Sequence, residues 1–203
     1  MNEGGRQGLA EIRSKLDLIR RVEAEHHFGV TIEGPRELVP IPELPEGVTD
    51  VFGLFYRLGG DFFIFRQPGE IASPDAWAGR TINPYCPLGS PLTIGRERHG
   101  IPADAYDEIE GGNGISLDAE DGSVFFMDGD DYVFAYENAD DDEELDVTEL
   151  SSDIVSFFNV HVLGGGYPEL IRAVLGRDAV TRRDRKGRHR DSWMRLLTES
   201  GLV

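Results

Sequence analysis

GISLDAEDGSVFFMDGDDYVFAY, residues 114–136, is the stretch that decides the fold. Three short pieces of it, 114–118, 123–127 and 132–136, are rich in β-branched and aromatic residues, which favour strands. The connections between them, DAEDG and DGDD, each contain an Asp-Gly pair of the kind found in tight hairpin turns. The stretch therefore predicts three antiparallel strands joined as a meander.

More strands are predicted upstream of this meander. DFFIFR at 61–66 has the composition of a buried strand, and shorter strand-like pieces lie at 92–95 and 106–109. The segment 67–79, which contains Trp77, is predicted to be a loop, and the proline-rich segment 34–45 is predicted to be a rigid connector. The sheet is thus expected to be mainly antiparallel.

Helices are predicted on both sides of the sheet region in the sequence, because apolar residues recur there at helical spacing. The first covers about residues 8–27, and the second begins at Leu44 or Pro45 and ends at the glycine pair 59–60. A third begins after a Ser151 or Ser152 cap and closes at the glycines 164–166. Two short helices, 168–175 and 191–200, flank a predicted basic loop. The fold class is therefore α+β.

Charge is distributed unevenly along the chain. The formal net charge is −18, and residues 99–171 contain 20 Asp and Glu side chains but no Lys or Arg. Residues 172–203 carry 9 basic and 4 acidic side chains, which leaves 11 basic and 34 acidic side chains, a local charge of −23, for the rest. Residues 1–171 thus form an acidic body, which repels nucleic acid and anionic membranes and attracts basic proteins. A protein partner is expected, although acidity can also serve solubility alone.

Localisation and metal binding are judged from a few residues. The N-terminal residues lack the apolar region of a secretory signal, and no run of about 18 apolar residues occurs, so a cytoplasmic protein is expected. Cys86 is the single cysteine, which excludes an intrachain disulfide and a CxxC motif. The side chains of His26 and His27 diverge on a helix, and an EF-hand centred on Gly122 or Gly129 lacks its first carboxylate. No metal site and no cofactor are predicted.

No catalytic set is predicted either. A nucleophilic Cys86 would need His99 or His161 as its base, and only an assumed fold brings them together. His161 falls on the apolar face of the third helix and is expected at the edge of the core. The GGNG sequence at 111–114 precedes a strand, not the helix of a nucleotide-binding loop. The basic loop 182–190 could contact nucleic acid or an acidic surface, including the acidic body of the same chain or of a dimer partner.

Four pieces occur in a distinctive order. Leu44-Pro45 opens a helix that ends in Leu58-Gly59-Gly60, a glycine-led strand follows at 114–118, an Asp-Gly hairpin precedes the strand at 123–126, and a serine-capped helix begins near 151. This order resembles the SUKH superfamily of Smi/Knr-type domains over about residues 40–165. The N-terminal helix, the insert 67–91 and the basic tail depart from the family pattern.

The resemblance implies a twisted, mainly antiparallel sheet flanked by helices, without enzymatic activity. It divides the chain into an N-terminal helix (1–34), a SUKH-like domain (35–176) and a basic C-terminal extension with a short helix (177–203). Many bacterial members look like immunity proteins that neutralise a nuclease or deaminase toxin, and others look like regulatory scaffolds with an endogenous partner. A monomer and a homodimer both remain open. The residues expected to contact a partner are Glu108, Glu110, Asp128, Asp130, Asp131, Asp140, Asp141 and Asp142.

Overall fold

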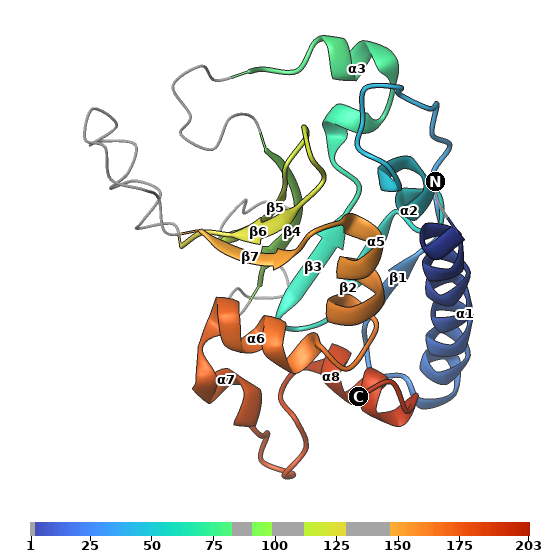
Figure 1. Cartoon of the computed structure of the whole chain (residues 1–203). Coiled ribbons are helices and arrows are strands. Elements are labelled where there is room, and N and C mark those ends of the chain that lie inside the picture. Colours follow the sequence, from blue (N-terminus) through green and yellow to red (C-terminus); the bar gives the residue numbers. More distant parts are fainter. Residues whose placement is uncertain (1–2, 83–90, 99–111, 129–146) are drawn as a thin grey trace, which may run out of the picture.

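The computed structural model describes residues 3–82, 91–98, 112–128 and 147–203. In this part of the chain the strands form one open sheet in the order β1-β2-β3-β4-β5-β6-β7, and every neighbouring pair is antiparallel (Figure 1). The α+β class and the mainly antiparallel sheet are therefore confirmed. The strands are β1 Thr31–Glu33, β2 Arg57–Gly59, β3 Phe63–Arg66, β4 Leu92–Glu97, β5 Gly114–Leu117, β6 Val124–Phe126 and β7 Thr148–Ser151.

The first hairpin of the predicted meander is confirmed. Strand β5 pairs with β6 so that Leu117 lies opposite Val124, and Gly122 adopts a positive φ of 86° in the turn between them. The predicted strands at 132–136 and 106–109 lie outside the described residues. The other neighbour of β6 is β7, a strand that the sequence did not indicate, because its four residues, Thr-Glu-Leu-Ser, contain one apolar side chain and no alternating pattern.

The second predicted helix is wrong in length. Only α2, Val48–Phe52, is helical, and the chain then enters β2, where Leu58 pairs with Phe65. The glycine pair 59–60 therefore ends β2 and begins the turn to β3, and it does not end a helix. Apolar residues at helical spacing continue to Leu58, but the sheet offers that residue a buried partner, and tertiary pairing overrides the local pattern.

The predicted loop 67–79 contains two helical turns, η1 Gly69–Ile71 and α3 Pro74–Ala78. Ser73 caps α3 by accepting a hydrogen bond of 3.1 Å from the Ala76 backbone N–H, and Pro74 occupies the first turn. This cap was a readable signal that the sequence interpretation missed. The remaining helices are α1 Glu3–His26, α5 Ile154–Ser156, the π-helical turn η3 Phe157–Val162, α6 Tyr167–Leu175, α7 Arg177–Thr181 and α8 Ser192–Glu199.

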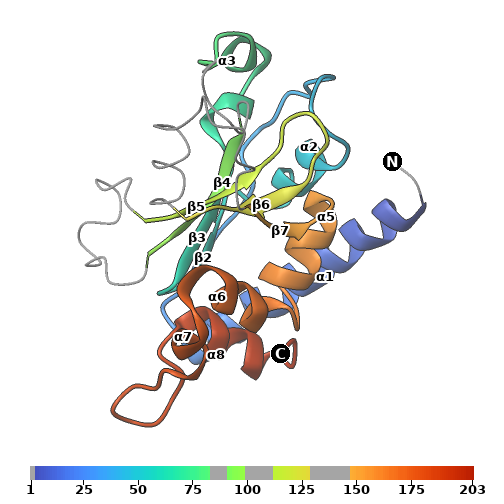
Figure 2. The same cartoon turned by 60° about the vertical axis from the view of Figure 1, so that its left-hand side comes forward.

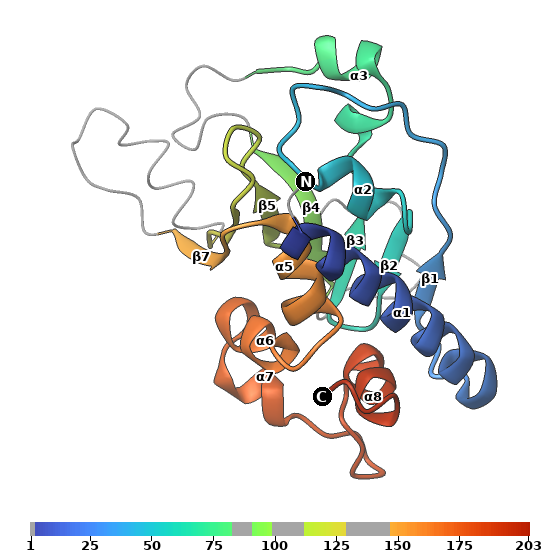
Figure 3. The same cartoon turned by 45° about the vertical axis from the view of Figure 1, so that its right-hand side comes forward.

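One hydrophobic core joins the sheet to the helices. The predicted apolar face of α1 is buried through Ile12, Leu16 and Ile19, and α1 and α5 lie in front of β2 and β3 in Figure 3. From β3, the Phe65 ring packs edge-on against Phe158, with the ring centroids 5.8 Å apart. The cap of α5 is Asp153, whose carboxylate accepts a hydrogen bond of 2.8 Å from the Ser156 N–H, and not Ser151 or Ser152 as predicted.

The C-terminal segment contributes to the same core. In α8, Trp193, Leu196 and Leu197 are fully buried, and the Trp193 indole N–H donates a hydrogen bond of 2.8 Å to the Val162 carbonyl. Helices α6, α7 and α8 gather at one end of the molecule, as Figure 2 shows. Within the described ranges, no helix combines the length and the apolar composition that a membrane span requires.

Candidate functional site

A buried carboxylate connects the C-terminal segment to the sheet. The Asp191 side chain is 0% exposed, and its Oδ2 atom accepts hydrogen bonds from the Tyr167 hydroxyl at 2.7 Å and from the Met194 N–H at 3.0 Å. Its Oδ1 atom accepts a hydrogen bond of 3.1 Å from the Phe62 N–H, in the turn between β2 and β3. Asp191 is thus the N-cap of α8 and a link to the sheet at the same time.

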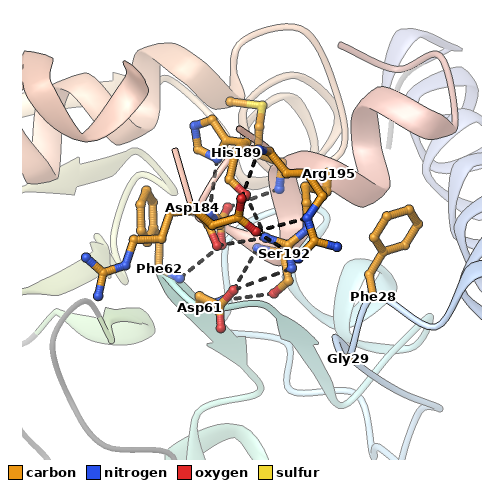
Figure 4. Close-up of polar contacts among 12 residues, drawn as sticks. Phe28, Gly29, Asp61, Phe62, Asp184, His189, Ser192 and Arg195 are labelled. Carbon is orange, nitrogen blue, oxygen red and sulfur yellow. Dashed lines mark hydrogen bonds and ion pairs between the residues drawn. The ribbon is translucent and has the colours of Figure 1, made fainter. Parts of the chain in front are cut away.

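A second set of contacts surrounds this link, and Figure 4 shows Asp61, Ser192, His189 and Arg195 gathered there. The Asp61 N–H donates to Ser192 Oγ at 3.2 Å, and the Ser192 N–H donates back to Asp61 Oδ2 at 2.9 Å. His189 accepts a hydrogen bond of 3.1 Å from the Asp191 N–H on Nδ1, and its Nε2 atom lies 2.9 Å from the Val180 carbonyl. These contacts require the neutral ring with its proton on Nε2.

Burial decides how this cluster is interpreted. Burial raises the pKa of Tyr167 well above its ordinary value, and the Asp191 charge raises it further. Burial also raises the pKa of Asp191, although the hydrogen bonds from Tyr167, Met194 and Phe62 oppose that rise. Perturbed pKa values are common in active sites, but both side chains here are fully enclosed and no substrate reaches them. We therefore interpret the cluster as structural.

A second group lies at one end of the sheet, where three polar residues flank the strand ends. Asn113 precedes β5, and its side-chain amide donates a hydrogen bond of 3.3 Å to Asp128, which follows β6. The Asn113 N–H donates at 3.5 Å to Glu97, the last residue of β4. Partial burial raises the pKa of Glu97, and the nearby Asp128 charge adds to this effect, while the Asn113 hydrogen bond opposes it. Two carboxylates therefore converge at this end.

The same end of the sheet is where the acidic runs of the sequence attach. Strands β4 and β6 end here, and strands β5 and β7 begin here. Phe126, the last residue of β6, pairs with Ile115 near the start of β5 and with Thr148 at the start of β7. Residues 99–111 and 129–146, which contain no Lys or Arg, connect these strand ends. Of the predicted contact residues, Asp128 lies in the described part of the chain. The others, Glu108, Glu110, Asp130, Asp131, Asp140, Asp141 and Asp142, lie outside it.

A groove of about 550 Å³ lies on the other side of the molecule, between the first turns of α1, the start of α2 and the start of α5. Among the described residues that line it, three are carboxylates, Glu11, Glu46 and Asp153, and none is Lys or Arg. Asn159 donates a hydrogen bond of 2.7 Å to Glu11, and Lys15 donates one of 2.6 Å to the Asn159 side-chain oxygen. We call this feature the acidic groove. The sequence did not indicate it, because its walls come from three distant segments.

The remaining candidates from the sequence have simple structural roles or lie elsewhere. His161 is half-buried, its Nδ1 atom is 3.3 Å from the Gly166 carbonyl, and its ring stacks on Phe157, as expected of a core-edge histidine. Cys86 and His99 lie outside the described residues. Over residues 3–82, 91–98, 112–128 and 147–203, no three His, Cys, Asp or Glu side chains are grouped so that they could hold a metal ion.

Comparison with known proteins adds no relative. No family model, no curated protein and no solved structure matches the chain.

Proposed function

We propose that this chain is a non-catalytic protein-binding domain that recognises a basic partner through the acidic end of its sheet. The proposal is carried by one observation. Glu97 and Asp128 converge at the end of the sheet where the two acidic runs, 99–111 and 129–146, attach, and neither run contains Lys or Arg. Arg96 and Arg98 flank Glu97 in the sequence, but the two runs contain 13 Asp and Glu side chains, so negative charge is in excess where they attach, and it steers and orients a basic protein.

The partner class that we propose is a toxin domain, with the chain acting as its immunity protein in the cytoplasm. Three of the four SUKH-like pieces, the glycine-led strand, the Asp-Gly hairpin and the closing helix, support this assignment, and so does the charge. A nuclease holds its nucleic acid through Lys and Arg side chains that contact phosphate, and an acidic inhibitor can cover those side chains. The alternative partner is an endogenous basic protein, in which case the domain acts as a regulatory scaffold of the Smi/Knr type.

The test uses the full chain and the purified toxin-like protein encoded by a neighbouring gene. The double variant Asp130→Lys and Asp131→Lys is compared with a matched control, Glu37→Lys and Glu70→Lys, which adds the same charge at exposed sites far from the acidic runs in sequence. Calorimetric titration at rising salt is expected to show tight binding by the wild type and the control, weakening with salt, and at least about tenfold weaker binding by the D130K/D131K variant.

Binding that is indifferent to salt and to D130K/D131K would overturn the charge-led proposal. Absence of binding to any toxin-like neighbour, together with salt-sensitive binding to an endogenous basic protein, would move the assignment to the scaffold alternative.

A further inference from the structure

The loop 182–190 is a preformed two-armed structure, which we call the basic finger. Its arms are joined by a β-bridge between Arg183 and His189 and by a hydrogen bond of 3.0 Å from the Arg190 N–H to the Arg182 carbonyl. At the centre, Asp184 Oδ2 accepts hydrogen bonds from Arg188 Nε at 2.9 Å and Nη2 at 2.7 Å. The loop predicted from the sequence is thus confirmed, and it is held in one shape by its own residues.

The base of the basic finger is anchored in the folded body. Arg195 Nη1 donates hydrogen bonds to the His189 carbonyl at 2.6 Å and to the Arg190 carbonyl at 2.8 Å. His189 itself bridges Val180 and the buried Asp191. A finger held at both its centre and its base loses little conformational freedom when it binds, and such preorganisation favours association.

The basic finger displays cations that its single carboxylate does not neutralise. Arg188 pairs with Asp184 and lowers the pKa of that carboxyl, so the charge of Asp184 is already engaged. Further basic side chains of the finger are exposed, among them Arg183, Arg185, Lys186 and Arg190. Three of these four are arginines, whose planar fork matches the two oxygens of a carboxylate.

The basic finger lies well away from the N-terminal turns of α1, which line the acidic groove, as Figures 1, 2 and 3 agree. The groove is formed by the N-terminal turns of α1, whereas the C-terminal residue of that helix, His26, lies 3.7 Å from Glu199 of α8, the helix that follows the finger. Glu11, the α1 residue of the groove lining nearest to His26, is 15 residues away from it, which is about 22 Å along the helix. The finger of one molecule therefore does not reach the groove of the same molecule.

We propose that the basic finger of one molecule docks into the acidic groove of a second copy of this chain. The groove is a concave surface whose walls carry three carboxylates, and Val155 packs closely against the Gly8 and Gly47 backbone at its lining. The exposed Val160 at its edge can cover the aliphatic stem of an arginine or lysine. The net charge of −18 repels nucleic acid and a second copy of the chain alike at long range, so the attraction between two copies comes from the opposite charges at the contact itself.

The contact is head-to-tail, because the two surfaces that meet are different and each molecule has one of each. Such a contact builds an open chain or a closed ring, and the smallest ring is a two-fold dimer in which each finger docks into the other molecule's groove. Because both surfaces are charged and exposed, the attraction between finger and groove weakens as salt rises, while salt also screens the repulsion between two molecules of net charge −18. The inference does not depend on the proposed toxin partner, since the acidic end of the sheet takes no part in it.

Two variants test the contact, one on each surface. The finger variant is Arg185→Glu with Lys186→Glu, and the groove variant is Glu11→Gln with Glu46→Lys. The matched control is Glu25→Gln with Glu70→Lys, the same two changes at exposed positions that do not line the groove. Circular dichroism of each variant checks folding, and sedimentation velocity at low and high salt measures assembly.

Wild type and control are expected to associate at low salt, and each surface variant to associate at least about tenfold more weakly. A mixture of the two surface variants is expected to form a one-to-one dimer and nothing larger, because one intact finger then meets one intact groove. A wild type that stays monomeric at low salt, or a mixture that forms no dimer, would overturn the proposal. So would binding of a labelled DNA duplex that the finger variant alone loses, because that result assigns the finger to phosphate.

Discussion

The Tyr167 hydroxyl donates a hydrogen bond of 2.7 Å to the Asp191 carboxylate, and both side chains are completely buried. This contact joins α6 to the N-cap of α8. Together with the bond from the Phe62 N–H to Asp191, it ties both helices to the turn between β2 and β3. One buried carboxylate therefore links the C-terminal segment to both α6 and the sheet.

Removal of the phenolic hydroxyl tests the strength of this link. The variant Tyr167→Phe leaves Asp191 without one of its donors inside the core, and we expect it to lower the free energy of unfolding by about 1–3 kcal/mol. Urea denaturation measures the change. The control variant is Tyr56→Phe, a half-buried tyrosine whose ring lies against Arg36 at 3.3 Å, and it is expected to cost less. Equal losses in the two variants would contradict the assigned role of Tyr167.

The raised pKa of Asp191 predicts a pH dependence of stability. Because the folded protein holds this proton more tightly than the unfolded chain does, the stabilisation from Asp191 is complete below its ordinary pKa of 3.8 and is lost as pH rises through the folded value. Asp191→Asn does not titrate. We therefore expect the difference in the free energy of unfolding, wild type minus variant, to fall as pH rises through this window. A difference that grows with pH would refute the direction of the shift.

Gly60 marks the place where the tail meets the sheet most closely. A Cβ atom there would lie 2.6 Å from the Trp193 backbone nitrogen and 2.7 Å from Ser192 Oγ. We expect Gly60→Ala to lower the free energy of unfolding by about 1–3 kcal/mol, since backbone atoms must move apart. The matched control is Gly165→Ala, which meets nothing within 4 Å. Thermal or urea unfolding of the two variants measures both changes. A Gly60→Ala variant as stable as the wild type would contradict a close contact between Gly60 and the start of α8.

The Glu97 carboxylate is disfavoured in its charged form by partial burial and by Asp128. A raised pKa means that its contribution to stability is present below the ordinary value of 4.5 and is lost as pH rises through the folded value. Glu97→Gln is therefore expected to raise the urea midpoint at neutral pH and to change it little in acid. Glu149→Gln, at an exposed site on β7, is the control. An equal gain at both pH values would exclude this electrostatic cause.

Some parts of the structure follow from local pattern, and some do not. The α1 face with Ile12, Leu16 and Ile19 and the hairpin between β5 and β6 could be predicted, because helical periodicity and turn chemistry act within a few residues. The end of α2 could not, because Leu58 continues a helical stripe and only the strand opposite makes it part of a sheet.

The candidate sites divide in the same way. By itself the sequence determined the α+β class, the acidic runs and the basic loop, because composition and short-range spacing are enough for these. Only the tertiary structure decided that Asp191 meets Phe62 across 129 positions of sequence, and that α1, α2 and α5 together enclose a groove. Contacts between distant segments depend on how helices and strands pack, and that packing is a property of the whole core and not of any stretch within it.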